Sequence, residues 1–140
     1  LVSDVDRSRL ERRRELRYLD KVVDSRDEAL REVARAKAAG EALSIGYEGN
    51  AGVEFPALYA EGFRPDAVTD QTSAHDMLNG YVPAGYMLDE AAALRASDPD
   101  EDEKRAFATV AAHVNGMLAF LDAGAIVFDY GNNIRAMAQR

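Results

Sequence analysis

The sequence contains no cysteine, and this absence excludes several kinds of chemistry within the chain. Without thiols it can form no disulfide, no thiolate nucleophile and no zinc site built on cysteine ligands. The composition is compatible with a reducing compartment, and we expect a cytoplasmic protein. The chain also begins without an initiator methionine and has no features of a signal peptide, so we expect it to be a piece of a longer protein.

Long apolar runs, repeats and an excess of positive charge are missing too. No apolar run approaches the roughly 18 to 20 residues of a membrane-spanning helix. The net charge is -8, and the one arginine-rich segment, residues 7–17, is interleaved with Glu11 and Glu15. Nucleic-acid surfaces concentrate positive charge, so we interpret this segment as a solvated helix face and expect neither a nucleic-acid nor a membrane partner. With 140 residues, 47% of them hydrophobic, the chain is expected to form a single domain.

Short apolar runs alternate with longer helical patterns along the chain. Strands are predicted at residues 42–47, 67–69 and 125–128, and residues 1–5 are typical of the end of another strand. The run at 125–128 is nearly all apolar, so we expect it to be buried on both faces. Helices are predicted at residues 7–18, between Ser25 and Gly40, at 53–61, at 89–96, from Pro99 to Gly124, and from Ile134 onward. The alternation predicts an α/β fold with a parallel sheet and helical crossovers.

Local signals fix where several helices begin. Asp6 and Asp98 are predicted N-caps, Pro99 occupies a first helical position, and Ser25 with Glu28 forms a capping box. Pro56 is expected to be tolerated only in the first turn of its helix. Leu10 and Leu16 are the expected inward anchors of the first helix. The longest helix is expected to bury an apolar stripe made of Phe107, Val110, Ala111, Val114, Met117, Leu118 and Leu121.

Each of the three complete strands is followed by a polar loop. These loops are residues 49–52, 70–81 and 129–133, and the second is especially rich in hydrogen-bonding side chains. Because parallel strands place their carboxyl ends at one edge of a sheet, we expect the three loops to converge on a ligand site.

Individual residues of these loops have ordinary alternatives. By spacing, Asp4 suits an acid that binds a ribose, yet an ordinary strand-end aspartate fits the sequence equally well. Arg9 is either a phosphate ligand or a surface arginine. His75, between Asp70 and Asp76, suits general acid-base work, although a histidine that only hydrogen-bonds its neighbours is the commoner case. Tyr81 and Tyr130 offer a ring face and a hydroxyl.

Other kinds of site are not predicted. His113 lies off the expected apolar stripe and receives no role. No metal site is predicted, because two isolated histidines and scattered acids lack ligand spacing. A hydrolase triad built on Ser73 is not expected, because no nucleophile-elbow motif surrounds it.

Several long motifs stand out along the chain: Leu43-Ser44-Ile45-Gly46, Gly49-Asn50-Ala51, Arg64-Pro65-Asp66, Val68-Thr69-Asp70-Gln71-Thr72-Ser73-Ala74-His75-Asp76, Leu78-Asn79-Gly80-Tyr81 and Phe128-Asp129-Tyr130-Gly131-Asn132-Asn133-Ile134-Arg135. They resemble the urocanase (urocanate hydratase) family, specifically its central Rossmann-like domain that binds NAD. The resemblance runs along essentially the whole chain. It implies a partial domain without the first strand and glycine-rich loop, and an active-site cysteine outside this sequence.

The resemblance also implies a reaction and a set of contacts. In the family, oxidised NAD acts as an electrophile toward urocanate, water is added, and imidazolonepropionate is released in histidine degradation without net redox change. It further implies a homodimeric full-length enzyme that binds NAD and urocanate, and a fragment inactive on its own. The implied NAD contacts are Asp4, Arg9, Asn50, Ala51, Gln71, Thr72, Ser73, Ala74, His75, Tyr81, Val82 and Tyr130. Asp4 stands where the family more usually has glutamate.

Two other functions remain open at this point. A stand-alone nucleotide-binding module without catalysis would have the same loops, and so would a domain of a redox dehydrogenase. The sequence on either side of residues 1–140 separates the enzyme from the module. Formation of NADH by the full-length protein would indicate the dehydrogenase.

Overall fold

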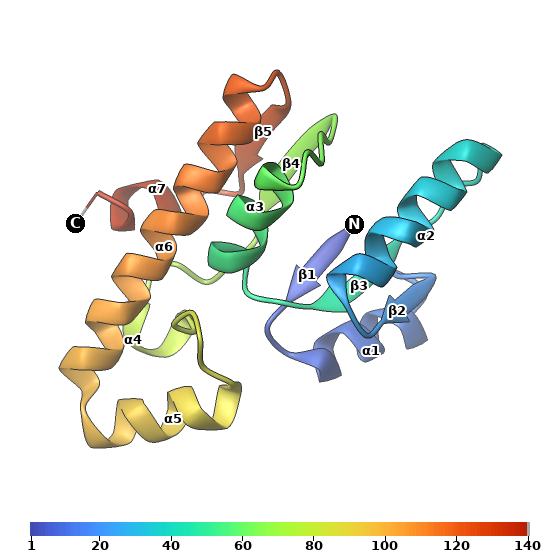
Figure 1. Cartoon of the computed structure of the whole chain (residues 1–140). Helices are drawn as coiled ribbons and strands as arrows, with labels where there is room; N and C mark the ends of the chain where they lie inside the picture. Colours follow the sequence, from blue (N-terminus) through green and yellow to red (C-terminus); the bar gives the residue numbers. More distant parts are fainter. Residues whose placement is uncertain (140) are drawn as a thin grey trace. The chain divides into compact units, whose positions relative to one another are not determined.

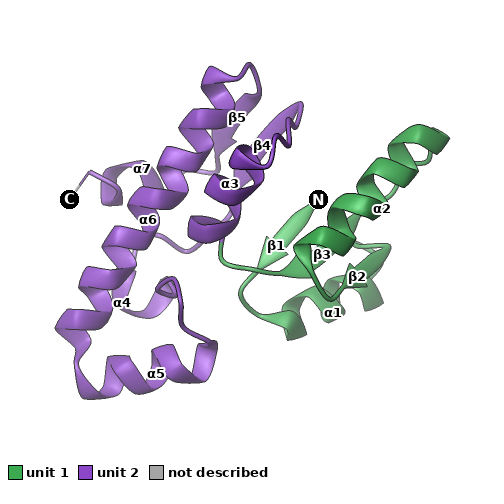
Figure 2. Cartoon of the chain, viewed as in Figure 1, with its two compact units in different colours: residues 1–50 green, residues 51–140 purple. Residues whose placement is uncertain are grey.

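The computed structural model describes residues 1–139 and divides into two compact units, Leu1–Asn50 and Ala51–Arg140 (Figures 1 and 2). Every pair of neighbouring strands in either unit is parallel, and helices connect the strands. The predicted α/β class with parallel strands and helical crossovers is confirmed. That the chain forms one domain stays a prediction.

Unit 1 is a three-stranded parallel sheet with the order β1-β3-β2. The elements are β1 (Val2–Asp4), α1 (Arg7–Glu15), β2 (Lys21–Val23), α2 (Arg26–Ala39) and β3 (Ile45–Glu48). Ile45 and Tyr47 of the central strand are buried with Val23 and Ala29, and Val33 and Leu43 pack against them. This small core holds α2 on the sheet, because apolar side chains from three elements leave water together.

The start of α1 agrees with the prediction, but its end does not. Asp6 is the N-cap and its carboxylate accepts a hydrogen bond from the Ser8 amide at 2.9 Å. The helix ends at Glu15 rather than residue 18, and Arg17 takes a left-handed conformation that turns the chain. Leu16 is consequently exposed, and Leu19 is the second buried leucine beside Leu10. The expectation that Leu16 is an inward anchor was wrong.

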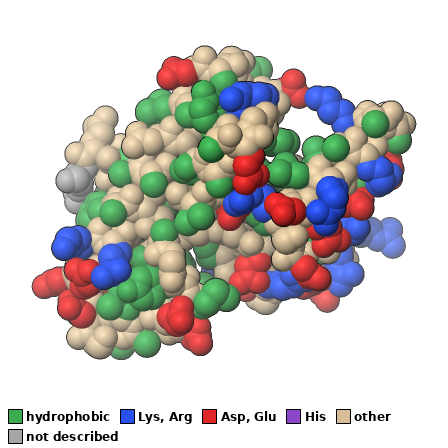
Figure 3. Space-filling view, in the orientation of Figure 1, with side chains coloured by type: hydrophobic (Ala, Val, Ile, Leu, Met, Phe, Trp, Pro, Cys, Tyr) green, Lys and Arg blue, Asp and Glu red, His purple; other side chains and the backbone are tan. Residues whose placement is uncertain are grey.

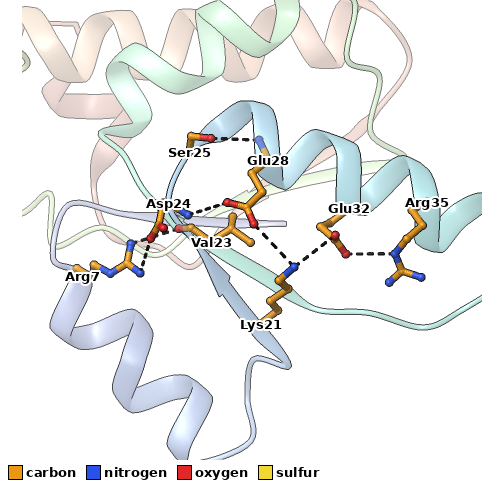
Figure 4. Close-up of polar contacts among 8 residues, drawn as sticks. All are labelled: Arg7, Lys21, Val23, Asp24, Ser25, Glu28, Glu32 and Arg35. Atoms are coloured by element: carbon orange, nitrogen blue, oxygen red, sulfur yellow. Dashed lines mark hydrogen bonds and ion pairs between the residues drawn. The ribbon is translucent and has the colours of Figure 1, made fainter.

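Charged side chains connect α1, β2 and the start of α2 (Figure 4). The Ser25 hydroxyl accepts a hydrogen bond from the Glu28 amide at 3.2 Å, as the capping box predicts. The Glu28 carboxylate accepts from the Asp24 amide, and an ion pair of 2.8 Å joins Arg7 to Asp24. Lys21 lies between Glu28 and Glu32. Exposed pairs of this kind add little stability individually, and Figure 3 shows acidic and basic side chains intermixed on the face in view.

Over residues 51–139, unit 2 contains a two-stranded parallel sheet and five helices. The elements are α3 (Ala51–Ala60), β4 (Ala67–Asp70), α4 (Met77–Gly80), α5 (Leu88–Ser97), α6 (Pro99–Asp122), β5 (Ile126–Asp129) and α7 (Ile134–Met137). Asp98 caps α6 and Pro99 is in its first turn, as predicted. The helix α3 begins at Ala51, so Pro56 is its sixth residue and lies beyond the first turn, contrary to expectation. Its missing N–H leaves one helical carbonyl without its usual donor.

The helix α6 is the centre of unit 2, but its buried face is rotated from the predicted stripe. The face consists of Asp102, Ala106, Thr109, Val110, His113, Gly116, Met117 and Phe120. Leu118 and Leu121, which the prediction placed inside, are exposed. Gly116 allows the close approach of α3, because a Cβ there would lie 2.7 Å from the Cβ of Phe55. A small residue at the crossing therefore decides which face packs.

The strand β5 also differs from its prediction. Ile126 and Phe128 are 69% and 46% exposed, so the strand is not buried on both faces. Its apolar sequence predicts an internal strand, but β5 has β4 as its only partner among the described residues. The expectation that three strands share one sheet edge was also wrong, because β3 belongs to the other sheet.

Candidate functional site

The loops after β4 and β5 lie together, as the sequence predicts. The two strands are parallel and pair Asp70 with Asp129 at their carboxyl ends. The Asn132 side-chain amide donates to the Asp70 carboxylate and, at 2.7 Å, to the Thr72 carbonyl. Its oxygen accepts from the Ile134 amide at 3.3 Å. One asparagine therefore joins the loop of residues 70–81 to the loop of residues 129–133 and to the start of α7.

Asp70 is the centre of a buried polar cluster, together with His113 of α6 and Tyr81. The three residues are 5%, 0% and 3% exposed. The Tyr81 hydroxyl lies 2.9 Å from His113 Nδ1, and His113 Nε2 lies 3.6 Å from an Asp70 oxygen. The Phe55 ring meets the imidazole edge to face at 4.9 Å between centroids. The prediction that gave His113 no role missed this cluster.

Burial determines the ionisation of the cluster. Desolvation lowers the pKa of His113, and the negative charge of Asp70 only partly opposes that change. Desolvation, followed by the same negative charge, raises the pKa of Tyr81. At neutral pH the imidazole is therefore uncharged and the phenol keeps its proton.

The loop from Gln71 to His75 has its small residue inside and its polar residues outside. Ala74 is fully buried, while the side chains of Gln71, Ser73 and His75 are exposed. The amide and hydroxyl of Thr72 both donate to Asp70, which fixes the start of the loop. Asp76 caps α4 by accepting from the Asn79 amide at 2.9 Å. The Asp76 pKa is lowered, first by that hydrogen bond.

The remaining predicted residues of unit 2 are in different environments. Tyr81 is in the core, and its hydroxyl is bonded to His113 rather than presented to solvent. Val82 follows it and is partly buried. Tyr130 is 65% exposed, and its ring lies 5.9 Å from that of Phe128. Ala51 is the first residue of α3.

The predicted residues of unit 1 lie at the carboxyl ends of β1 and β3 and at the start of α1. The Asp4 carboxylate accepts from the Asp6 amide at 3.1 Å and forms a 2.6 Å ion pair with Arg13. Arg9 is exposed and lies 3.4 Å from Asp6. Asn50 follows β3 and is partly buried. Sequence reasoning missed Arg13, which follows Asp4 by nine residues and reaches it from the partly exposed surface of α1.

The missed residues of unit 2, His113 and Asn132, differ in how they could have been found. His113 continues the series Ala106, Val110, His113, Met117 and Phe120, which has helical spacing, so a stripe drawn one position over would include it. Asn132 lies inside a loop that was predicted, although its bond to Asp70 was not.

Two further observations concern classes of site. Within residues 1–139, no cluster of three or more histidine, aspartate or glutamate side chains is arranged to hold a metal ion. None of the helices in that range is both long and apolar enough to cross a membrane.

Comparison with protein families agrees with the resemblance seen in the motifs. The family model described as the urocanase Rossmann-like domain matches residues 1–140, which is the whole chain. The match includes the strands, both joined loops and the helix that carries His113. A Rossmann-like domain binds a nucleotide at the carboxyl ends of its parallel strands. The chain belongs to the urocanase family, and residues 1–140 match its Rossmann-like domain.

Proposed function

We propose that this chain is the NAD-binding part of a urocanate hydratase, a hydro-lyase that adds water to urocanate to give imidazolonepropionate in histidine degradation. The observation that carries the proposal is the match of the urocanase Rossmann-like domain over residues 1–140. The loops after β4 and β5 support it, because they place hydrogen-bonding side chains at the sheet edge where such folds hold their ligands.

The residues at this edge suit the uncharged parts of a dinucleotide. Gln71 and Ser73 can both donate and accept, as a carboxamide and ribose hydroxyls require, and their side chains are exposed. Tyr130 offers an exposed ring face. In unit 1 the Asp6 amide donates to one Asp4 oxygen and Arg13 to the other. Because a carboxylate oxygen has two lone pairs, Asp4 keeps capacity for ribose hydroxyls.

The protein's contribution is to bind and orient. When bound, oxidised NAD supplies an electrophilic nicotinamide ring that returns to its starting state after each turnover. Asn132 and Asp70 hold the backbone of Thr72, so the segment from Gln71 to His75 has a fixed course before any ligand arrives. His75 is exposed at the end of this segment and is available as a hydrogen-bonding partner.

The proposal includes properties of the full-length protein. We propose a cytoplasmic homodimer, in which residues outside 1–140 supply a glycine-rich phosphate loop and an active-site cysteine. The chain alone would then lack both catalysis and the pyrophosphate contacts, since helix N-termini and glycine-rich turns provide much of the affinity for that group. Nanomolar NAD affinity measured by calorimetry on residues 1–140 would contradict this part.

Activity of the full-length protein tests the proposal. We expect tightly bound NAD, loss of urocanate absorbance and no accumulation of NADH. Gln71→Ala and His75→Ala should each lower NAD retention or turnover about fivefold or more, since each removes hydrogen bonds worth about 1 kcal/mol or more. Gln139→Ala, at an exposed glutamine outside the predicted contacts, is the matched control. Unchanged NAD and turnover in both loop variants would remove this loop from the site, and NAD without turnover in the parent would favour a binding module.

A further inference from the structure

Both ends of the loop that carries Gln71 to His75 contact the same imidazole. Asp70 precedes the loop and lies 3.6 Å from His113 Nε2. Tyr81 follows it and places its hydroxyl 2.9 Å from His113 Nδ1. The imidazole is fully buried, and it comes from α6, the longest helix of the unit. Both ends of the loop therefore contact one side chain of α6.

The donors and acceptors in the cluster can be assigned in one consistent way. An ionised Asp70 only accepts, and it already takes hydrogen bonds from Thr72 and Asn132. His113 must therefore turn an N–H, on Nε2, toward Asp70. The neutral ring then has a lone pair on Nδ1, which accepts from the Tyr81 hydroxyl. His113 Nε2 has no hydrogen-bond partner among the described residues, and an Asp70 oxygen lies 3.6 Å from it, slightly beyond hydrogen-bond distance.

The loop also contacts itself. A Cβ on Gly80 would collide with the Ser73 carbonyl, so the segment after His75 returns against the segment before it. Ala74 is buried with Met77 and Tyr81 in the same apolar cluster as Ala106 and Val110 of α6. The distance between Asp70 and Tyr81 therefore determines the course of the residues between them.

We propose that His113 is a positioning residue, which sets the spacing of Asp70 and Tyr81 and so preorganises the segment Gln71 to His75 for its ligand. The identity of that ligand as NAD rests on the proposed function, whereas the ordering of the loop does not. A loop ordered in advance loses less conformational entropy on binding, so disordering it should weaken binding without changing any contact residue.

Four variants of the full-length protein test this proposal. Tyr81→Phe removes one hydroxyl and keeps the ring. His113→Leu removes both polar contacts, whereas His113→Gln keeps one donor and one acceptor at the same place. Asn115→Ala, at an exposed position of the same helix, is the control. The measurements are the rate of NAD release, the melting temperature and amide hydrogen exchange in residues 71–80.

We expect a graded result. Tyr81→Phe should speed NAD release roughly five- to tenfold, the usual effect of one buried hydrogen bond. His113→Leu should speed it roughly ten- to a hundredfold, because the Tyr81 hydroxyl is left buried without its acceptor. His113→Gln should restore part of the loss, and Asn115→Ala should match the parent. Amides of Thr72 and Ala74, which donate to Asp70 and to the Thr72 carbonyl, should exchange faster in the first two variants.

The outcomes separate this inference from the proposed function. Lower melting temperatures with unchanged exchange in residues 71–80 and unchanged NAD release would overturn the positioning role. If the parent protein holds no NAD, the proposed function fails, and faster exchange in residues 71–80 of Tyr81→Phe still supports the positioning role. Equal rates of NAD release from His113→Gln and His113→Leu would also overturn the positioning role.

Discussion

A histidine without access to solvent stays neutral because the charged imidazolium would lose its hydration. Desolvation lowers the pKa of His113 below its ordinary 6.5, and its polar neighbours are Asp70 and Tyr81. Because the folded pKa is lowered, the unfolded chain binds the proton first as the pH falls. Stability is therefore complete above about 6.5 and decreases as the pH falls from there toward the folded pKa.

The decrease of stability with falling pH is the basis of the first prediction. The free energy of unfolding of residues 1–140 should decrease between pH 7 and 5, with a His113 contribution of at most about 1.4 kcal/mol per pH unit. In His113→Gln that contribution should vanish, so the parent and variant curves should converge at acidic pH. Urea unfolding at several pH values measures it. Carboxyl groups with lowered pKa values, such as Asp76, change the stability only near and below the ordinary pKa of 3.8. They therefore contribute little to the change between pH 7 and 5. Parallel curves would contradict the prediction.

The proposed role of Arg13 depends on a single contact. Its guanidinium lies 2.6 Å from Asp4, whose side chain is mostly buried. A hydrogen bond to this carboxylate fixes the direction in which its free lone pairs point. We expect Arg13→Gln to weaken NAD binding by the full-length protein by roughly three- to tenfold, as loss of one charge-assisted hydrogen bond implies.

The neighbouring arginine gives the control for that measurement. Arg12 is exposed on the same helix, and Arg12→Gln changes the net charge equally. Calorimetry on protein depleted of NAD compares the two variants. If both weaken binding to the same extent, the effect is one of general charge and the assigned role of Arg13 is incorrect.

At the scale of elements, local signals predicted the ends of helices better than the faces they bury. Asp6, Ser25 and Asp98 each cap the helix predicted for them, because a cap depends only on residues within one turn. The strand β2 was not predicted, since three residues between Asp20 and Asp24 give almost no periodic signal. The face of α6 was misjudged because α3 selects it from another part of the chain through Gly116.

That selection gives a prediction about α6. In Gly116→Ala the new Cβ would lie 2.7 Å from the Cβ of Phe55 and 3.1 Å from Pro56 Cδ. Overpacking costs about 1–3 kcal/mol, and the better helix propensity of alanine returns up to about 1 kcal/mol. We expect a net loss of about 1–2 kcal/mol in the free energy of unfolding, measured with urea. Asn115→Ala, one residue away on the exposed side, should be neutral or stabilising. A Gly116→Ala protein as stable as the parent would show that α3 moves aside without cost.

At the scale of the whole molecule, the predicted contacts are divided between the two units. Sequence reasoning correctly joined the loops after β4 and β5, because parallel pairing alone brings their ends together. It could not find the cluster of Asp70, Tyr81 and His113. His113 is 32 residues from Tyr81 in the sequence and farther from Asp70, so only packing brings it to them. Asp4, Arg9 and Asn50 belong to unit 1, whereas Gln71 to His75 and Tyr130 belong to unit 2.

The division of the predicted NAD contacts between the two units leads to the last prediction. If one NAD molecule contacts the residues assigned to it, binding should slow amide exchange in both units, since ligand binding to the folded state suppresses local opening. In the full-length protein depleted of NAD, adding NAD should protect segments around Asp4 and Asn50 as well as residues 71–75. The exposed end of α2 near Lys37, far in sequence from every assigned contact, should exchange at the same rate with and without NAD. Protection confined to residues 70–81 and 129–133 would show that the assignments in unit 1 are wrong, while the site built on β4 and β5 would stand.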